Sequence, residues 1–309
     1  PVPVAPGAST LGWIGTGVMG RSMAGHLRDA GFDVVLTTRS RAKAEPLLER
    51  GCRWADTPAA VAAAADAVFV MVGHPADVRE VVCGADGVLS ALRPGAMLVD
   101  HTTSSPELAA EIAALARPRG SWSLDAPVSG GDRGAREGTL TVMVGGDDAP
   151  REALAACWKV VAGNVVACGG PGAGQRTKLA NQIAIAGGMV GMCEALLFAH
   201  RAGLDVETTL RAISGGAAGS WSLTNLAPRI VRGDFAPGFM VEHFVKDMRL
   251  ALDECRRLDL PLPGLALVEA LYTSLMAQGH GRSGTQALVL ALATLARHPW
   301  PAVAPAQLS

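Results

Sequence analysis

Short apolar runs alternate with amphipathic stretches through the first half of the chain. The runs predict strands at residues 10–14, 33–38, 67–72, 97–100, 139–144 and 165–168. Helical periodicity between them predicts helices near residues 21–30, 41–50, 57–65, 75–82 and 106–117. This alternation is typical of a doubly wound α/β sheet, whose ligands bind at the carboxyl ends of the strands.

The second half shows helical periodicity alone. Helices are expected near residues 205–214, 220–232, 241–258, 263–278 and 284–297. The fold class is therefore α/β, with an N-terminal Rossmann-type doubly wound sheet joined by a long buried helix to an all-α C-terminal domain.

That joining helix is expected within residues 172–200. From Ile183 to Cys193 it is apolar on every face, which is typical of a helix buried between layers or subunits. These eleven residues are too few for a bilayer, which needs about 20. Gly187 and Gly191, four residues apart, would let another backbone pack closely.

Lys178 falls in the expected first turn of this helix. The positive end of the helix dipole and partial desolvation would both disfavour its charged form and tune it toward proton transfer near neutral pH. A solvated lysine at a helix start is the alternative.

The first predicted strand runs into Gly15-Thr-Gly17-Val-Met-Gly20, followed by a helix and a second strand. This is the context that the dinucleotide fingerprint requires. Its glycines allow a tight turn, close approach of the pyrophosphate and close packing of helix on strand, and the helix N-terminus faces the phosphates.

The end of the second strand bears on the choice of cofactor. NAD enzymes usually carry an acid there, but no Asp or Glu lies between Asp33 and Glu45. Arg39, Ser40 and Arg41 stand there instead, and their donors suit a 2′-phosphate. NADP(H) is favoured and NAD(H) is possible; a solvated basic helix start is the alternative.

Two loops after later strands carry polar groups. Thr102 and Thr103 would contact the nicotinamide ribose, or else cap the helix that opens at Pro106. Ser129-Gly-Gly131 leaves backbone N–H groups accessible beside a hydroxyl, which suits a carboxylate, although a plain turn has the same composition.

Composition and charge limit the classes of partner that the protein could bind. The chain has 309 residues, is 49% hydrophobic and 18% charged, and carries a net charge of −1, which argues against nucleic acid or an anionic membrane. Six scattered cysteines and seven histidines show no metal-ligand spacing, so no metal is expected. The absence of a visible signal peptide, together with free thiols, indicates a cytoplasmic protein.

Taken together, these stretches make the chain resemble the β-hydroxyacid dehydrogenase family from about Leu11 to Arg297. The matching motifs, in order, are Gly15 to Gly20, Asp125 to Gly131, Gly172 to Gln182, and Phe244-Val-Lys246-Asp247.

The resemblance assigns residue roles. Lys178 stands where the family keeps its catalytic lysine, and Ser129, Gly130 and Gly131 where it binds the substrate carboxylate. Asn181 matches the first of two asparagines, whereas Gln182 replaces the second. Trp221 would line the substrate pocket. By the fingerprint and the resemblance, the expected cofactor-binding residues are Gly15, Gly17, Val18, Met19, Gly20, Thr38, Arg39, Ser40, Met71, Val72, Thr103 and Lys246.

The implied activity is NAD(P)-dependent interconversion of a small β-hydroxy acid and its semialdehyde, of the 3-hydroxyisobutyrate, tartronate semialdehyde or succinic semialdehyde/glyoxylate type. The partner would be a small carboxylate-bearing aldehyde or hydroxy acid, with no nucleic acid or membrane, in a homodimer or homotetramer. The alternatives are an imine reductase, which usually lacks the lysine, and a non-catalytic NADP-binding paralogue.

The expected domains follow. They are a flexible tail at 1–10, a dinucleotide-binding domain at 11–172, an interdomain helix at 173–200, an all-α substrate and oligomerisation domain at 201–298, and a flexible tail at 299–309.

Overall fold

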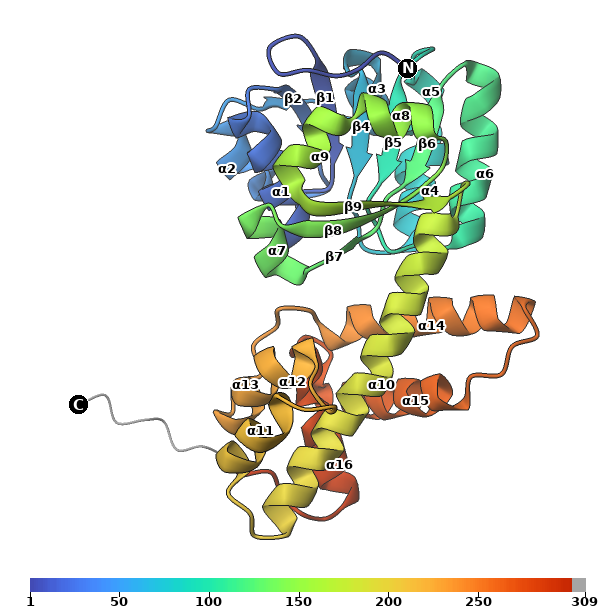
Figure 1. Cartoon of the computed structure of the whole chain (residues 1–309). Helices are drawn as coiled ribbons and strands as arrows, with labels where there is room; N and C mark the ends of the chain where they lie inside the picture. Colours follow the sequence, from blue (N-terminus) through green and yellow to red (C-terminus); the bar gives the residue numbers. More distant parts are fainter. Residues whose placement is uncertain (302–309) are drawn as a thin grey trace. The chain divides into compact units, whose positions relative to one another are not determined.

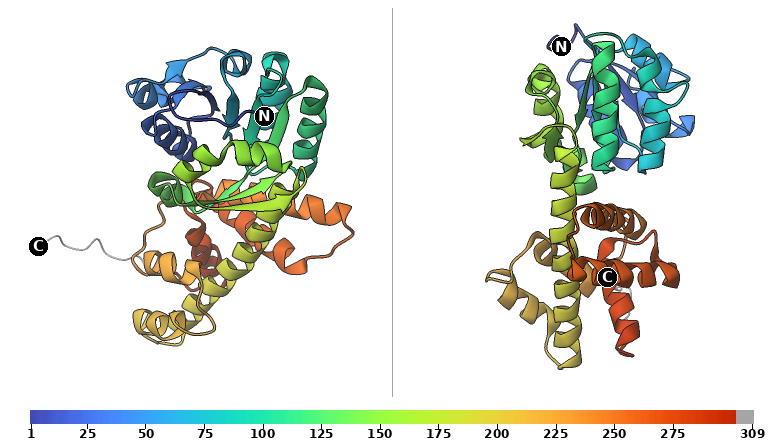
Figure 2. Two further views of the ribbon diagram at one scale, coloured as in Figure 1. Left: turned by 45° about the horizontal axis from the view of Figure 1, so that its top comes forward. Right: turned by 90° about the vertical axis from the view of Figure 1, so that its right-hand side faces the viewer.

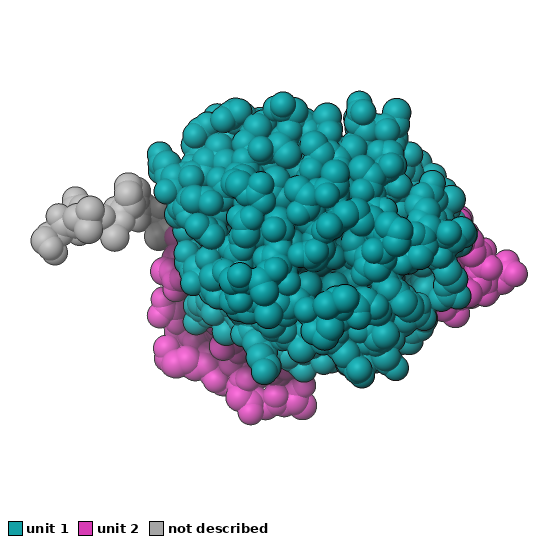
Figure 3. All heavy atoms as spheres, turned by 90° about the horizontal axis from the view of Figure 1, so that it is seen from above, with its two compact units in different colours: residues 1–178 teal, residues 179–309 magenta. Residues whose placement is uncertain are grey.

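The computed structural model describes residues 1–301. Backbone contacts divide the chain into two compact units, the first formed by Pro1–Lys178 and the second beginning at Leu179. Figure 1 labels their helices and strands, and Figure 3 colours each unit. The last eight residues of the predicted 299–309 tail lie outside the described residues. The part that is described is packed at Trp300, whose indole N–H donates to the Ile230 carbonyl at 3.2 Å.

The described strands form one sheet in the first unit, in the order β3-β2-β1-β4-β5-β6-β8-β7, with β9 beside β8. The strands from β3 to β6 run parallel, and β8 runs antiparallel to β6 and β7 and parallel to β9. They are β1 (Thr10–Ile14), β2 (Asp33–Thr37), β3 (Arg53–Trp54), β4 (Ala67–Val70), β5 (Met97–Asp100), β6 (Trp122–Asp125), β7 (Val128–Ser129), β8 (Leu140–Gly145) and β9 (Ala162–Gly169).

Helices cover both faces of this sheet (Figure 2). They are α1 (Val18–Asp29), η1 (Arg41–Lys43), α2 (Glu45–Leu48), α3 (Pro58–Ala64), α4 (Pro75–Cys83), α5 (Val88–Ala91), α6 (Pro106–Ala116), η2 (Arg117–Arg119), α7 (Gly131–Glu137), α8 (Asp148–Ala153) and α9 (Ala155–Val161).

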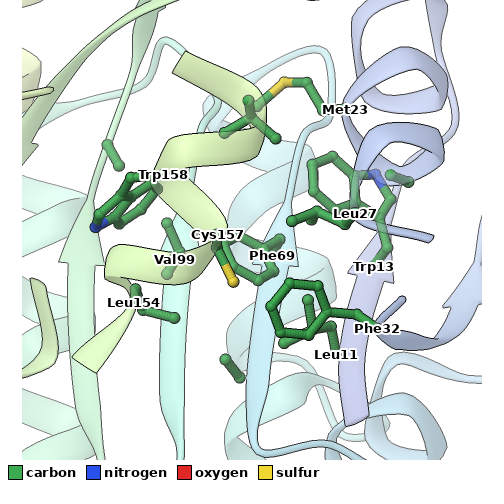
Figure 4. Close-up of a cluster of buried hydrophobic side chains, with 14 of the residues drawn as sticks. Leu11, Trp13, Met23, Leu27, Phe32, Phe69, Val99, Leu154, Cys157 and Trp158 are labelled. Carbon is green, nitrogen blue, oxygen red and sulfur yellow. The ribbon is translucent and has the colours of Figure 1, made fainter. Parts of the chain in front are cut away.

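Alternation along the strands builds a core on each face, because successive strand side chains point to opposite sides. In β4, Phe69 belongs to the cluster under α1 and α9, whereas Val68 and Val70 pack under α3 and α4. Trp13 lies opposite Phe69 in the register, and their rings stack with centroids 5.6 Å apart. Figure 4 shows this cluster, including Trp158 from α9.

The N-terminal segment is packed where a flexible tail over residues 1–10 was expected. Val4 is buried, and its N–H donates to the Ala153 carbonyl at 3.0 Å. Thr10 is already the first residue of β1. The apolar side chain of Val4 explains the docking, since it joins the core that α8 and α9 close.

The described part of the second unit is helical, as expected. Its elements are most of α10 (Ala173–Arg201), followed by α11 (Val206–Ser214), α12 (Trp221–Asn225), α13 (Ala227–Val231), α14 (Val241–Arg257), α15 (Pro263–Leu275), η3 (Met276–His280), η4 (Thr285–Ala287) and α16 (Leu288–Leu295). One antiparallel bridge joins Met240 to Gly284.

Helix α10 differs from the expected all-round buried helix. Gly187, Gly188 and Gly191 are exposed, and a Cβ added at any of them would meet nothing within 4 Å. The close backbone contact expected at Gly187 and Gly191 is therefore wrong within a single chain, because these glycines share an uncovered face. By length and composition α10 could also cross a membrane, but such a helix is weak evidence, since the core helices of soluble proteins pass the same test.

The predicted fold class is confirmed, with local differences. The helix expected at residues 41–50 is split into η1 and α2, with a proline near the start of α2. The helix expected at residues 220–232 is likewise split, since α13 begins at Ala227-Pro228. Proline cannot donate an N–H and is tolerated in a first helical turn.

Candidate functional site

The glycine loop after β1 is pressed against the loop after β4. Gly15 has φ of +96°, and a Cβ added there would lie 2.2 Å from the Met71 carbonyl oxygen. A Cβ at Gly20 would lie 2.2 Å from the Gly15 carbonyl oxygen. Only glycine fits both positions. The structure thus brings two of the predicted cofactor-binding segments together, at the point where the strand order reverses on either side of β1.

The N-terminus of α1 fits a pyrophosphate. It has no side-chain cap and no acidic residue in its first turn. A Cβ added at Gly17 would meet nothing within 4 Å, and Val18 is 58% exposed. Thr16 Oγ1 is buried and has no hydrogen-bond partner among the described residues. The free backbone N–H groups at such a helix end donate hydrogen bonds to anions, so this loop suits the phosphates of a dinucleotide.

The residues after β2 extend from this loop. The Thr16 N–H donates to Thr38 Oγ1 at 3.5 Å. The side chain of Arg39 is 88% exposed, with Nη1 3.5 Å from Asp77 Oδ1. The guanidinium of Arg41 lies 5.0 Å from the ring centre of Trp54. Arg41 is the first residue of η1, and Ser40 is its N-cap. The alternative of a basic helix start therefore applies to Arg41 but not to Arg39, which precedes the helix.

The loop after β5 contacts the loop after β4. Thr102 Oγ1 accepts from the Val72 N–H at 3.0 Å, and the Thr102 N–H donates to Asp100 Oδ1 at 2.9 Å. The cap of α6 is Ser105, whose hydroxyl accepts from the Leu108 N–H. The cap alternative for Thr102 and Thr103 is therefore wrong, because Ser105 occupies the cap position.

The Ser-Gly-Gly segment joins the end of β7 to a short helix. Ser129 is the last residue of β7, and Gly130, with φ of +126°, is the cap of α7. Gly131 has φ of +62°, and a Cβ added there would meet nothing within 4 Å. With positive φ at both glycines, the segment turns the chain from β7 into α7, so the plain-turn alternative stays open. Its use as a carboxylate cradle stays a prediction.

The start of α10 is held by a buried carboxylate. Asp125, the last residue of β6, accepts from the Gly172 N–H at Oδ1 and from the Gln175 N–H at Oδ2, both at 2.8 Å. Burial raises the pKa of Asp125, although these backbone hydrogen bonds oppose the shift. A Cβ at Gly174 would lie 2.4 Å from the Met143 carbonyl oxygen, so only glycine lets the helix start so close to β8.

Lys178 lies on α10 after this anchored turn. It is only 7% exposed, so the alternative of a solvated lysine at a helix start is wrong. Lysine is rarely buried to this degree without a role for its charge, which makes the position a candidate site.

A cluster of hydrogen-bonded and charged side chains lies in the second unit. Asn181 Nδ2 donates to Gln182 Oε1 at 2.9 Å, and Gln182 Nε2 donates to Asp247 Oδ2 at 2.6 Å. Lys246 Nζ lies 3.1 Å from Asp247 Oδ1, with the Asp247 side chain 2% exposed. With exposures of 14% for Lys246 and 2% for Asp247, this ion pair is not a solvated surface pair. Trp221 begins α12 and is 65% exposed.

Sequence reasoning missed the structural roles of Asp125, Gln175 and Asp247. Gln175 has no exposed surface, and its side chain bonds two backbone groups of the loop after β5. The available signal was a polar residue inside a glycine-rich, otherwise apolar stretch. No group of three or more His, Cys, Asp or Glu within residues 1–301 is placed to hold a metal ion.

Comparison with known proteins adds an independent finding. Residues 10–170 match the NAD-binding domain of 6-phosphogluconate dehydrogenase, and residues 172–292 match the NAD-binding model of NADP-dependent 3-hydroxyisobutyrate dehydrogenase. A probable 3-hydroxyisobutyrate dehydrogenase-like protein of Arabidopsis thaliana is 51% identical, over 94% of this chain and 87% of that protein.

Two further similar proteins carry names from the same family. The 2-hydroxy-3-oxopropionate reductase of Escherichia coli is 39% identical, over 93% of this chain and 98% of its own length. The structure of Mycobacterium tuberculosis 3-hydroxyisobutyrate dehydrogenase with L-serine has a TM-score of 0.85 at 30% identity, over 92% of this chain and 99% of that one. With its open dinucleotide loop and these relatives, the chain is an NAD(P)-dependent oxidoreductase that belongs to the β-hydroxyacid dehydrogenase family.

Proposed function

We propose that the protein interconverts a small β-hydroxy acid and its semialdehyde, with Lys178 as general acid and base. The observation that carries this proposal is the burial of Lys178 just after a helix start fixed by Asp125. A buried lysine on a rigid element is held in one place, as a proton donor must be.

NADP(H) is the proposed cofactor. Gly15, Gly17 and Gly20 would hold its pyrophosphate at the start of α1, and the exposed Arg39 would bind the 2′-phosphate. The nicotinamide, when bound, supplies or accepts a hydride. The remaining cofactor contacts are proposed at Val18, Met19, Thr38, Ser40, Met71, Val72, Thr103 and Lys246.

The chain's own residues would place the substrate and move the proton. Ser129, Gly130 and Gly131 would bind the carboxylate and so fix the distance of the carbonyl from Lys178. In the reducing direction the Lys178 ammonium donates a proton to the oxygen as it becomes an alkoxide. In the oxidising direction the neutral amine takes the hydroxyl proton.

Asn181, Gln182 and Trp221 are the remaining residues proposed to contact the substrate. Asn181 and Gln182 follow Lys178 on α10, and Gln182 is held by the buried Asp247. Trp221, exposed at the start of α12, would select the group that the substrate carries beside its carbonyl.

The test is Lys178→Met, which keeps the length of the apolar stem and removes the proton donor. We expect kcat to fall by about 10²- to 10⁴-fold, with little change in NADPH affinity. Lys178→Arg should not restore activity, because a guanidinium stays protonated. Lys159→Met, which removes an exposed lysine of α9, is the matched control and should keep wild-type kcat. A Lys178→Met enzyme with half of the wild-type kcat would contradict the proposal.

A further inference from the structure

Gln175 is bonded at both ends of its amide. Its Nε2 donates to the Thr102 carbonyl at 2.7 Å, and its Oε1 accepts from the Ser104 N–H at 2.9 Å. Its own N–H donates to Asp125 Oδ2 at 2.8 Å. The fully buried side chain of Gln175 thus ties the first turn of α10 to the loop after β5, and its backbone N–H ties the same turn to Asp125 at the end of β6.

The same loop is tied onward to the glycine-loop region. Thr102 Oγ1 accepts from the Val72 N–H at 3.0 Å. The carbonyl of the neighbouring Met71 lies against Gly15 of the fingerprint loop, so closely that a Cβ on Gly15 would be 2.2 Å from its oxygen. A continuous set of hydrogen bonds and close contacts therefore runs from the dinucleotide loop to Gln175.

Lys178 follows Gln175 by three residues on α10. Residues three apart share one face of an α-helix and are separated by about 4.5 Å of rise. Both side chains are buried. Any rotation or slide of the first helical turn relative to the loop would therefore carry Lys178 with it.

We propose that Gln175 is a positioning residue that fixes Lys178 relative to the loop at residues 102–104, which carries the proposed cofactor contact Thr103. This inference rests on the function proposed above. Gln175 makes no proton transfer of its own; it sets the distance between the proton donor and the reacting carbon. Because a misplacement of 1 Å can cost about 10²-fold in rate, a side chain remote from substrate can control kcat.

The test combines Gln175→Met with Lys178→Met. Methionine keeps an unbranched chain of similar length and removes both hydrogen bonds. The matched control is Gln286→Met, because Gln286 is also buried and its Nε2 also donates to backbone carbonyls, those of Asp234 and Ala236. Each variant is assayed for kcat and, without cofactor, for hydrogen exchange at the Ser104 amide.

We expect Gln175→Met to lower kcat by about 10²-fold and Gln286→Met to leave it unchanged. If Gln175 acts through Lys178, adding Gln175→Met to Lys178→Met should cost less than about threefold more. The Ser104 amide should exchange faster in Gln175→Met and as in wild type in Gln286→Met. If Gln175→Met does not fold, Asp125→Asn, which weakens the same anchor, takes its place in the cycle.

Two results would overturn the inference. One is a wild-type kcat in Gln175→Met, and the other is an undiminished loss when that change is made in the Lys178→Met background. Failure of the proposed function would look different, because Lys178→Met with Gln175 intact would then keep wild-type kcat.

Discussion

His101, the residue after β5, is a buried histidine whose protonation should weaken the fold. Its ring stacks on Phe69, with centroids 5.7 Å apart, and its Nδ1 donates to the Ala126 carbonyl at 2.6 Å. Nε2 is buried and has no hydrogen-bond partner among the described residues. A second proton would therefore place a charge on a nitrogen that no group within residues 1–301 accepts a hydrogen bond from.

Burial lowers the pKa of His101 from 6.5 to about 4, although the bond to Ala126 acts in the opposite direction. The unfolded chain takes up a proton at this histidine as the pH falls below 6.5, and the folded protein does so only near pH 4. The free energy of unfolding therefore falls with pH across this window. The shift corresponds to about 3 kcal/mol in full, of which about 2 kcal/mol is lost by pH 5.

The perturbation that isolates this contribution is His101→Phe, which keeps an aromatic ring and cannot titrate. Urea unfolding at pH 8 and pH 5, followed by the fluorescence of Trp13 and Trp158 beside the ring, gives the free energy of unfolding. The wild type should lose about 2 kcal/mol more than His101→Phe between the two pH values. His101→Leu, a second variant that cannot titrate, should behave like His101→Phe. Equal losses in the wild type and both variants would refute the reasoning.

Three further predictions concern the cofactor, the substrate and the thiols. Replacing Arg39 and Arg41 with alanine should raise the KM for NADPH about 10- to 100-fold more than that for NADH in steady-state assays, and a wild type that prefers NADH would contradict this. Because Ser129–Gly131 offer donors to an anion, semialdehyde acids should be turned over and equally long aldehydes without the acid should not; equal kcat/KM values would rule the cradle out. Burial raises the pKa of Cys157 and Cys193 to about 12, so both should resist iodoacetamide at pH 8 in the native enzyme and react after unfolding, as mass spectrometry of peptides would show.

The strands around the dinucleotide loop were predictable because their signals are local. Residues 67–70 and 97–99 are buried on both faces, so each is a continuous apolar run with no competing helical period. The short helices α8 and α9 were not predicted. Each spans fewer than two full turns, too short for a periodic pattern, and α9 is held through Cys157 and Trp158 in the core beneath it.

The candidate site was only partly predictable, because its supporting contacts join residues distant in sequence. A glycine-rich turn followed by a lysine marked the start of α10, but the burial of Lys178 depends on how that turn docks. The docking is determined by Asp125, which lies 47 residues before Gly172 and 50 before Gln175. No local pattern can indicate such a partner, since an aspartate after a strand is equally compatible with a solvated loop.

Gln182 shows how a departure from a family pattern is interpreted differently once its partner is known. In sequence, Gln182 stands where the family pattern has the second of two asparagines. In the structure its amide reaches Asp247, 65 residues away on α14, and accepts from Asn181 at its other end. The Asp247 carboxylate is buried beside Lys246, and an uncompensated buried charge is costly, so a donor at this position serves the carboxylate first. The side chain at position 182 is thus constrained by a partner on another helix, and Asn181 is oriented through it.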